Sequence, residues 1–283
     1  FSELRRRAWY VSEMLARLGV KSGDRVAILM ENSPEWFEIY HGIVGIGAIA
    51  IPVDAKLREQ EVAHIFHDCG VSAVFCSVRL MVLIAEIGSL LHELRSMIVL
   101  DYNGDTPMAY ESLNCHAYTQ LWDEAASGAE AEGRAFDRMG PTALSPASFI
   151  YTSGTTGRQK GAVLTHHNFM SNVAGIAKAI DVRDTDNFML VLPLHHSFAF
   201  TCNLLLPLYA RCEISLVENL KTIKANMADC SPTVLLAVPL LLEKMLARVM
   251  DGINASKPAR LMYRYGLAKV VGRRIHAGLG GAL

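Results

Sequence analysis

Short runs of apolar and β-branched residues alternate with segments of helical periodicity through the first hundred residues of the chain. The runs that predict buried strands cover residues 25–30, 48–53, 71–76 and 97–100. The periodic segments that predict helices cover residues 34–46, 59–69 and 79–91. Repeated strand–helix units of this kind predict an α/β fold with mostly parallel β-sheets flanked by helices.

The periodicity fades between residues 103 and 147, where Gly, Pro, Ser and acidic residues are frequent. This segment predicts surface loops and a boundary between subdomains. Beyond it, strands are expected at residues 148–152, 162–165, 188–193, 213–217 and 233–238, and a helix at 168–180. The sequence therefore predicts a first α/β subdomain over residues 1–140 and a second over residues 141–283.

Two segments raise the question of membrane contact. The first, FSELRRRAWYVSEMLARLG, is amphipathic, which favours a core-facing helix over a helix on a membrane surface, so peripheral membrane association stays open. The second, residues 188–210, has no charged residue and is about as long as a membrane-spanning helix. Its two prolines, two histidines and Asn203 would break such a helix or place polar groups in lipid. A buried strand followed by a buried helix is expected instead.

Composition narrows the class of protein. Hydrophobic residues make up 51% of the 283 residues and charged residues 19%, which suits a globular protein with a sizeable core. Lys plus Arg (27) nearly balances Asp plus Glu (28), so no nucleic-acid partner is expected. The six cysteines form no C-x-x-C pair, which argues against a zinc site or a disulfide framework and favours a cytoplasmic location.

The segment TSGTTGRQKG, residues 152–161, has the composition of a phosphate-binding loop and directly follows the apolar run SFIY. Its glycines allow backbone conformations in which successive N–H groups converge on an anion, while hydroxyls and a lysine add donors and positive charge. Its order differs from the G-x-x-x-x-G-K-[ST] loop of P-loop ATPases. By composition alone, a flexible turn between two strands is an equal alternative. The residues expected to contact phosphate are Thr152, Ser153, Gly154, Thr155, Thr156, Gly157 and Lys160.

The longer stretch YTSGTTGRQKGAVLTHHN resembles the signature of the adenylate-forming superfamily of AMP-binding enzymes, which includes acyl-CoA synthetases and luciferases. The resemblance implies that this loop closes over the β- and γ-phosphates of ATP, and that Mg²⁺ helps a carboxylate displace pyrophosphate to give an acyl-adenylate. It also implies that Lys160 is catalytic and that Thr152 is the hydroxyl near the metal. The family usually has proline where this chain has Gln159, which weakens the expected preorganisation of the loop by at most about 1 kcal/mol.

The block LPLHHSF, residues 192–198, resembles the family's next motif, and His196 matches its histidine. In relatives that histidine lies beside the reacting carboxylate, so the match implies a catalytic role in orienting or neutralising it. His195 stands where an aromatic residue is common, and its role stays open. His64 and His67 complete no set of metal ligands and are interpreted as surface or packing residues.

The block SPTVLLAVPLLLEKM, residues 231–245, is similar to one in long-chain acyl-CoA synthetases. It implies a fold like the large N-terminal domain of those enzymes, a fatty acid as substrate and coenzyme A as co-substrate, with AMP and pyrophosphate released. Three alternatives stay open: adenylation of another acid, transfer to acyl carrier protein, and a non-catalytic nucleotide-binding module.

Members of the resembled family continue past the last residue of this sequence, with residues for adenine and ribose and a mobile C-terminal lid domain that carries a catalytic lysine. The sequence is therefore expected to be the N-terminal part of a larger enzyme, to lack the lid domain, and to have little activity alone. Residues 276–283 are expected to enter a strand that is cut short. An unpaired sheet edge there would favour self-association, so a homodimer stays open.

Overall fold

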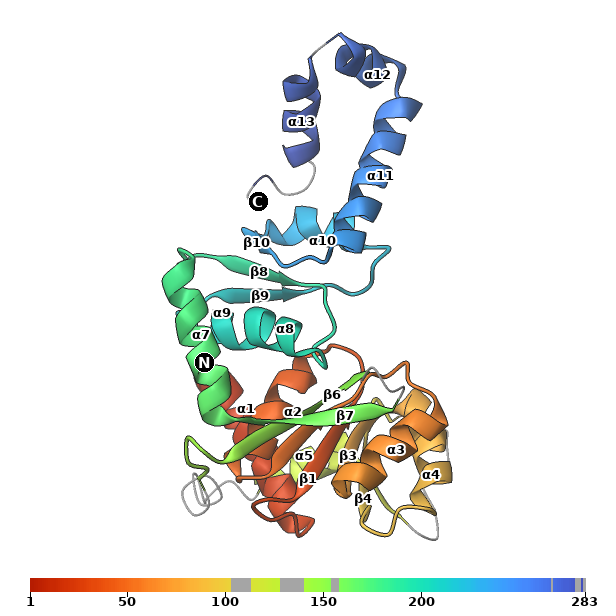
Figure 1. Ribbon diagram of the computed structural model, residues 1–283, viewed down its shortest axis with the longest axis vertical. Coiled ribbons are helices and arrows are strands. Elements are labelled where there is room, and N and C mark those ends of the chain that lie inside the picture. Colours follow the sequence, from red (N-terminus) through yellow and green to blue (C-terminus); the bar gives the residue numbers. More distant parts are fainter. Residues whose placement is uncertain (103–112, 128–139, 154–157, 266, 278–280, 282–283) are drawn as a thin grey trace. The chain divides into compact units, whose positions relative to one another are not determined.

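The computed structural model describes residues 1–283 except 103–112, 128–139, 154–157, 266, 278–280 and 282–283 (Figure 1). The chain divides into two compact units. The first unit comprises residues 1–172 and 195–197, and the second comprises residues 173–194 and 198–283. The subdomains expected over residues 1–140 and 141–283 stay a prediction, because compact packing units need not coincide with subdomains.

A seven-stranded β-sheet forms the centre of the first unit, in the order β5-β4-β3-β1-β2-β6-β7 (Figure 1). Neighbouring strands are parallel except for β6 and β7, which pair antiparallel. The predicted α/β fold with mostly parallel strands is confirmed. The strands are β1 (Arg25–Leu29), β2 (Ile49–Pro52), β3 (Val71–Ser77), β4 (Ser96–Leu100), β5 (Asn114–Ala117), β6 (Pro146–Ser153) and β7 (Gln159–Thr165).

Helices cover both faces of this sheet (Figure 1). One face carries α1 (Ser2–Arg17), α2 (Pro34–Gly45) and α5 (Tyr118–Ser127), and the other carries α3 (Glu59–Cys69), the 3₁₀ turn η1 (Val78–Leu80) and α4 (Met81–Gly88). The inner strands β2, β3 and β4 are buried throughout, as expected of parallel strands covered on both faces. On the second face, Val62, Ile65 and Phe66 of α3 are at most 1% exposed and pack in one cluster with α4.

Helix α1 lies on α2 with its apolar side, so the prediction of a core-facing N-terminal helix is confirmed. Trp9 is 6% exposed and Leu15 is fully buried. The two helices approach so closely that a Cβ atom on Gly42 of α2 would lie 2.5 Å from Cβ of Val11. Only glycine fits at that crossing without moving a helix backbone.

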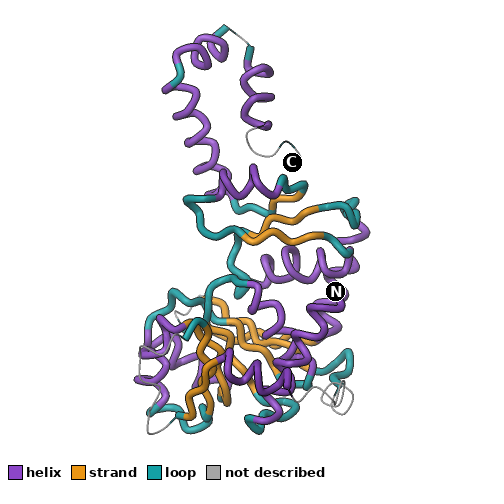
Figure 2. Tube along the Cα trace, turned by 180° about the vertical axis from the view of Figure 1, so that it is seen from behind, coloured by secondary structure: helices purple, strands orange, loops and turns teal. Residues whose placement is uncertain are grey.

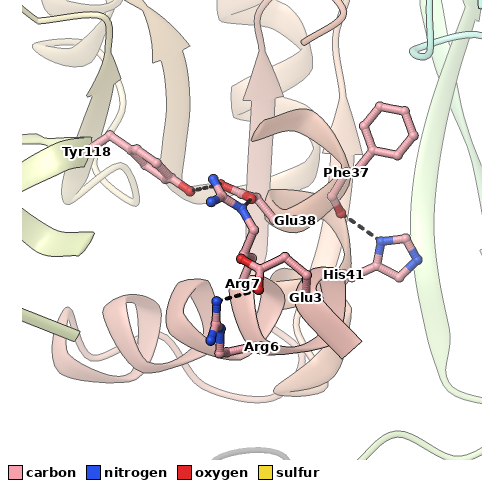
Figure 3. A network of polar contacts seen from close by, with 7 residues as sticks. All are labelled: Glu3, Arg6, Arg7, Phe37, Glu38, His41 and Tyr118. Atoms are coloured by element: carbon pink, nitrogen blue, oxygen red, sulfur yellow. Dashed lines mark hydrogen bonds and ion pairs between the residues drawn. The ribbon is translucent and has the colours of Figure 1, made fainter. Parts of the chain in front are cut away.

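A polar cluster joins α1, α2 and α5 (Figure 3). The carboxylate of Glu38 is buried, forms an ion pair with Arg7, and accepts a hydrogen bond from the Tyr118 hydroxyl. The guanidinium of Arg7 also lies 4.6 Å from the centre of the Trp122 ring, a cation–π contact. Burial is the main cause that raises the pKa of Tyr118 above its ordinary value, and the negative charge of Glu38 adds to it. The buried charge is therefore compensated from two sides.

The second unit contains a three-stranded parallel sheet in the order β10-β8-β9. Its strands are among those drawn in orange in Figure 2. Phe188 packs with α7 and α9, while Met189 packs with α10, so helices contact both faces. The long helix α7 begins in the first unit and ends in the second. The elements are α7 (His166–Ala179), β8 (Asn187–Leu190), α8 (Ser197–Phe200), the π-helix η3 (Thr201–Leu205), α9 (Leu206–Ala210), β9 (Glu213–Leu216), α10 (Ile223–Cys230), β10 (Val234–Leu235), α11 (Pro239–Ala255), α12 (Lys257–Arg264) and α13 (Ala268–Ala277).

Two expectations about local structure were wrong. Residues 114–127 are not surface loop but form β5 and α5, because β5 pairs with β4 and because Tyr118, Leu121 and Ala125 bury one side of α5. Residues 276 and 277 lie in α13, so the strand expected from residue 276 does not begin there; most of its remaining residues lie outside the described part of the chain.

The apolar segment 188–210 forms a buried strand and a largely buried helical run, as predicted. Among the described residues, no helix has both the length and the apolar character needed to cross a membrane.

Candidate functional site

The predicted phosphate loop begins at the carboxyl edge of the seven-stranded sheet. Strands β2 and β6 are parallel neighbours, with Ala50 opposite Ser148. Four residues further along each strand direction are Asp54 and Thr152. In open α/β sheets, ligands bind outside the carboxyl ends of the strands, and both residues lie at this edge.

Strands β6 and β7 form the stem of the loop, which confirms the expectation that a strand rather than a helix follows it. Thr152 is opposite Lys160, and Ser153 is opposite Gln159. Side chains at opposed positions of an antiparallel pair lie on the same face, so Thr152 and Lys160 project from the same face of the hairpin, and both residues are exposed. Gly154, Thr155, Thr156 and Gly157, the predicted tip of the loop, lie outside the described residues.

Helix α3 holds the stem through two side-chain hydrogen bonds. His64 donates Nε2–H to the backbone carbonyl of Gln159 over 3.1 Å, and the Tyr151 hydroxyl donates to Oδ2 of Asp68 over 2.6 Å. The Tyr151 ring covers Gly161, its partner on β7, where a Cβ atom would lie 2.9 Å from the ring carbon Cζ. The interpretation of His64 as a surface or packing residue was therefore incomplete, since its side chain is hydrogen-bonded to the residue next to Lys160.

His195 and His196 form the second part of the candidate site, together with Asp54. The two Nε2 atoms are 3.1 Å apart, and Nε2 of His195 is also 3.6 Å from Oδ2 of Asp54. The His195 side chain is 14% exposed, whereas His196 is an exposed residue. Burial, with the neighbouring His196, lowers the pKa of His195 to about 4, and the negative charge of Asp54 opposes this shift. His195 is therefore neutral near pH 7.

The structure thus brings the described site residues into two groups within one compact unit. One group is Thr152 with Lys160, and the other is His196 with His195 and Asp54. Among the described residues, no group of three or more His, Cys, Asp or Glu side chains could hold a metal ion. Thr152 offers an exposed hydroxyl at the edge of the sheet, an oxygen ligand of the kind that Mg²⁺ accepts beside nucleotide phosphates.

A pocket of about 280 Å³ lies elsewhere in the first unit, between α1, α5 and the end of β4. Arg7, Asp101 and Trp122 are among its lining residues, and none of the predicted site residues is. The candidate site is therefore defined by the β6–β7 stem and the histidine pair, and this pocket is not part of it.

Known proteins are similar to this chain in sequence. The model of the family described as AMP-binding enzyme matches residues 1–279. Long-chain-fatty-acid–CoA ligase FadD13 of Mycobacterium tuberculosis is 31% identical over 195 residues, which cover 67% of this chain and 34% of that protein. Long-chain-fatty-acid–[acyl-carrier-protein] ligase AEE15 of Arabidopsis thaliana is 24% identical over 274 residues, which cover 92% of this chain and 36% of that protein. The chain thus spans about a third of the length of these relatives.

Solved structures share its fold. The inhibitor-bound N-terminal domain of FACL13 from Mycobacterium tuberculosis matches with a TM-score of 0.70 at 25% identity, over 86% of this chain and 57% of that chain. ATP-bound MatB from Rhodopseudomonas palustris matches with a TM-score of 0.70 at 26% identity, over 87% of this chain and 45% of that chain. The expected likeness to the N-terminal domain of acyl-CoA synthetases is confirmed. The chain belongs to the adenylate-forming superfamily of AMP-binding enzymes.

Proposed function

We propose that the protein activates a long-chain fatty acid with ATP and transfers the acyl group to coenzyme A. In the first step a carboxylate oxygen bonds to the α-phosphorus of ATP and pyrophosphate leaves, giving acyl-AMP. In the second step the thiol of coenzyme A displaces AMP and gives acyl-CoA. The observation that carries the proposal is the β6–β7 stem at the carboxyl edge of the sheet, which pairs Thr152 with Lys160 in a chain of the AMP-binding family.

Lys160 and Thr152 supply the positive charge and the hydrogen-bond donor that the first step requires. The ammonium of Lys160 stabilises the negative charge that develops on the departing pyrophosphate, and the hydroxyl of Thr152 donates to the same phosphates or binds the metal. Mg²⁺, when bound, neutralises phosphate charge. His196 orients the carboxylate through a hydrogen bond, since an imidazole ring has an N–H to donate. The four loop-tip residues, with Ser153, would supply further N–H and O–H donors.

The relatives support the substrate class and leave two candidates for the acceptor. FadD13 and AEE15 are both ligases of long-chain fatty acids by name, one with coenzyme A and the other with acyl carrier protein as acceptor. Coenzyme A is the first candidate because the more similar of the two relatives uses it. Transfer to acyl carrier protein is the second.

Fatty-acid-dependent exchange of labelled pyrophosphate into ATP tests the first step in the full-length protein, over a series of acids of increasing chain length. We expect exchange with long-chain acids and a loss of about 10²–10³-fold in its rate for Lys160→Ala. Lys178→Ala on α7 removes an exposed lysine outside the site and serves as the matched control. Wild-type rates in Lys160→Ala, or no exchange with any acid, would contradict the proposal.

The acceptor is tested separately by supplying coenzyme A or the phosphopantetheine form of acyl carrier protein after acyl-AMP has formed. We expect the thioester of coenzyme A. A thioester found only on the carrier protein would select the second candidate.

A further inference from the structure

We propose that Asp54 and His195 are positioning residues that fix the ring of His196 so that its Nδ1–H is the group offered to the reactants. This inference rests on the proposed function of His196. It adds Asp54, which no motif of the sequence marks, gives a role to His195, and assigns a specific ring nitrogen to the reaction.

The geometry around Nε2 of His195 carries the inference. This one atom faces Nε2 of His196 at 3.1 Å, a hydrogen-bond distance, and Oδ2 of Asp54 at 3.6 Å, which is too long for a hydrogen bond but close enough for the charge to act. One of the two histidines must donate in the pair and the other must accept. The position of Asp54 decides which of them donates.

A carboxylate favours a proton on the nitrogen that faces it. Because His195 is neutral near pH 7, it has a single N–H, and Asp54 places that N–H on Nε2. His195 is then the donor of the pair, and Nε2 of His196 is the acceptor. An imidazole that accepts at Nε2 carries its proton on Nδ1, so His196 presents Nδ1–H as its free donor.

The backbone holds Asp54 in this orientation. Its other carboxylate oxygen, Oδ1, accepts a hydrogen bond of 3.0 Å from the backbone N–H of Lys56, and the turn is closed by a bond of 3.1 Å from the N–H of Leu57 to the carbonyl of Asp54. Asparagine can keep the first of these bonds through its own oxygen. Asp54→Asn therefore removes the charge, turns an N–H₂ group towards His195, and leaves the turn intact.

Kinetics on the full-length protein test whether the two residues act through His196. We expect Asp54→Asn and His195→Phe each to lower kcat of acid-dependent pyrophosphate exchange about tenfold, with KM for ATP changed less than about twofold. In a His196→Ala background neither substitution should lower kcat further, because the ring they position is gone. Asp123→Asn, an exposed carboxylate on α5, is the control and should keep wild-type kcat. Effects that multiply in the His196→Ala background, or wild-type kcat in Asp54→Asn, would overturn the inference.

The nitrogen shifts of ¹⁵N-labelled histidines give a second readout that needs no turnover. At neutral pH we expect a protonated Nε2 on His195 and a protonated Nδ1 on His196, with both assignments exchanged in Asp54→Asn. A protonated Nε2 on His196 in the wild type would refute the positioning role. If no acid supports exchange, the proposed function fails, and the nitrogen shifts still decide whether Asp54 sets the two rings.

Discussion

The ion pair between Arg7 and Glu38 links α1 to α2 (Figure 3). Its contribution to stability can be tested by removing the positive charge. The Glu38 side chain is 2% exposed and that of Arg7 is 37% exposed. The substitution Arg7→Met removes the guanidinium that lies over Trp122 but keeps an apolar side chain about as long as the aliphatic stem of arginine. Glu38 then retains its hydrogen bond from Tyr118 but loses the positive charge that offsets its own.

Breaking a buried ion pair by removing one partner costs about 3–5 kcal/mol, because an uncompensated charge stays buried. Arg7 is partly exposed, so water can enter part of the space that its side chain vacates. We therefore expect the free energy of unfolding to fall by about 3 kcal/mol, the lower end of this range. A loss of about 1 kcal/mol lowers Tm by roughly 2–4 °C in a unit of this size. The variant should therefore melt roughly 6–12 °C below the wild type.

Thermal and urea unfolding followed by circular dichroism give both quantities. Arg6→Met is the control, because Arg6 pairs with Glu3 at the surface, and its Tm should stay close to that of the wild type. Adding Glu38→Gln to Arg7→Met should recover most of the lost stability by removing the orphaned charge. The reasoning is refuted if Arg7→Met has the same Tm as Arg6→Met, or if adding Glu38→Gln makes Arg7→Met less stable still.

Three further predictions concern the helix crossing and the site. Gly42→Ala should lower the free energy of unfolding by about 2 kcal/mol in urea titrations, because the new methyl group overlaps Val11; unchanged stability would show that the crossing is looser. His64→Ala should raise KM for ATP roughly 2–10-fold by freeing the Gln159 carbonyl, with partial recovery in His64→Gln; an unchanged KM with wild-type kcat would contradict the anchoring role. The pKa of His195 is about 4 in the folded protein and about 6.5 in the unfolded chain, so the unfolded chain binds the proton first as pH falls. The free energy of unfolding should therefore fall as pH drops from about 6.5 towards 4. Tm measured against pH should fall less steeply in His195→Phe.

The strands of the first unit were predictable because parallel strands buried on both faces have continuous apolar sequences. Strand β3, VSAVFCS, shows this in every residue. Strand β5, NCHA, lies at the sheet edge and is largely polar, so its sequence carries no such signal. Helix α5 had a usable signal in the spacing of Tyr118, Leu121 and Ala125, but the acidic and small residues around them obscured it.

The candidate site was predictable only where its chemistry is local in sequence. The glycines, hydroxyls and lysine of the phosphate loop stand within ten residues and share one composition. The bond between His64 and Gln159 joins residues 95 positions apart, and His195 and Asp54 are still further apart. Such residues meet because of the order of the strands in the sheet. The apolar periodicity of a single segment predicts a strand but not its neighbours in the sheet.

The order of the sheet also has a consequence for biosynthesis. Strands β1 to β5 come from one continuous stretch of sequence, whereas β6 must return to pair with β2 after β5 has been made. At about 5–20 residues per second, translation separates Ala50 from its partner Ser148 by roughly 5–20 seconds. During that interval β2 is an open edge, and Pro52, which has no N–H to donate, limits its pairing with other chains. The nascent chain therefore completes the β2 side of this sheet last, and premature termination before β6 would leave a five-stranded sheet without the stem of the candidate site.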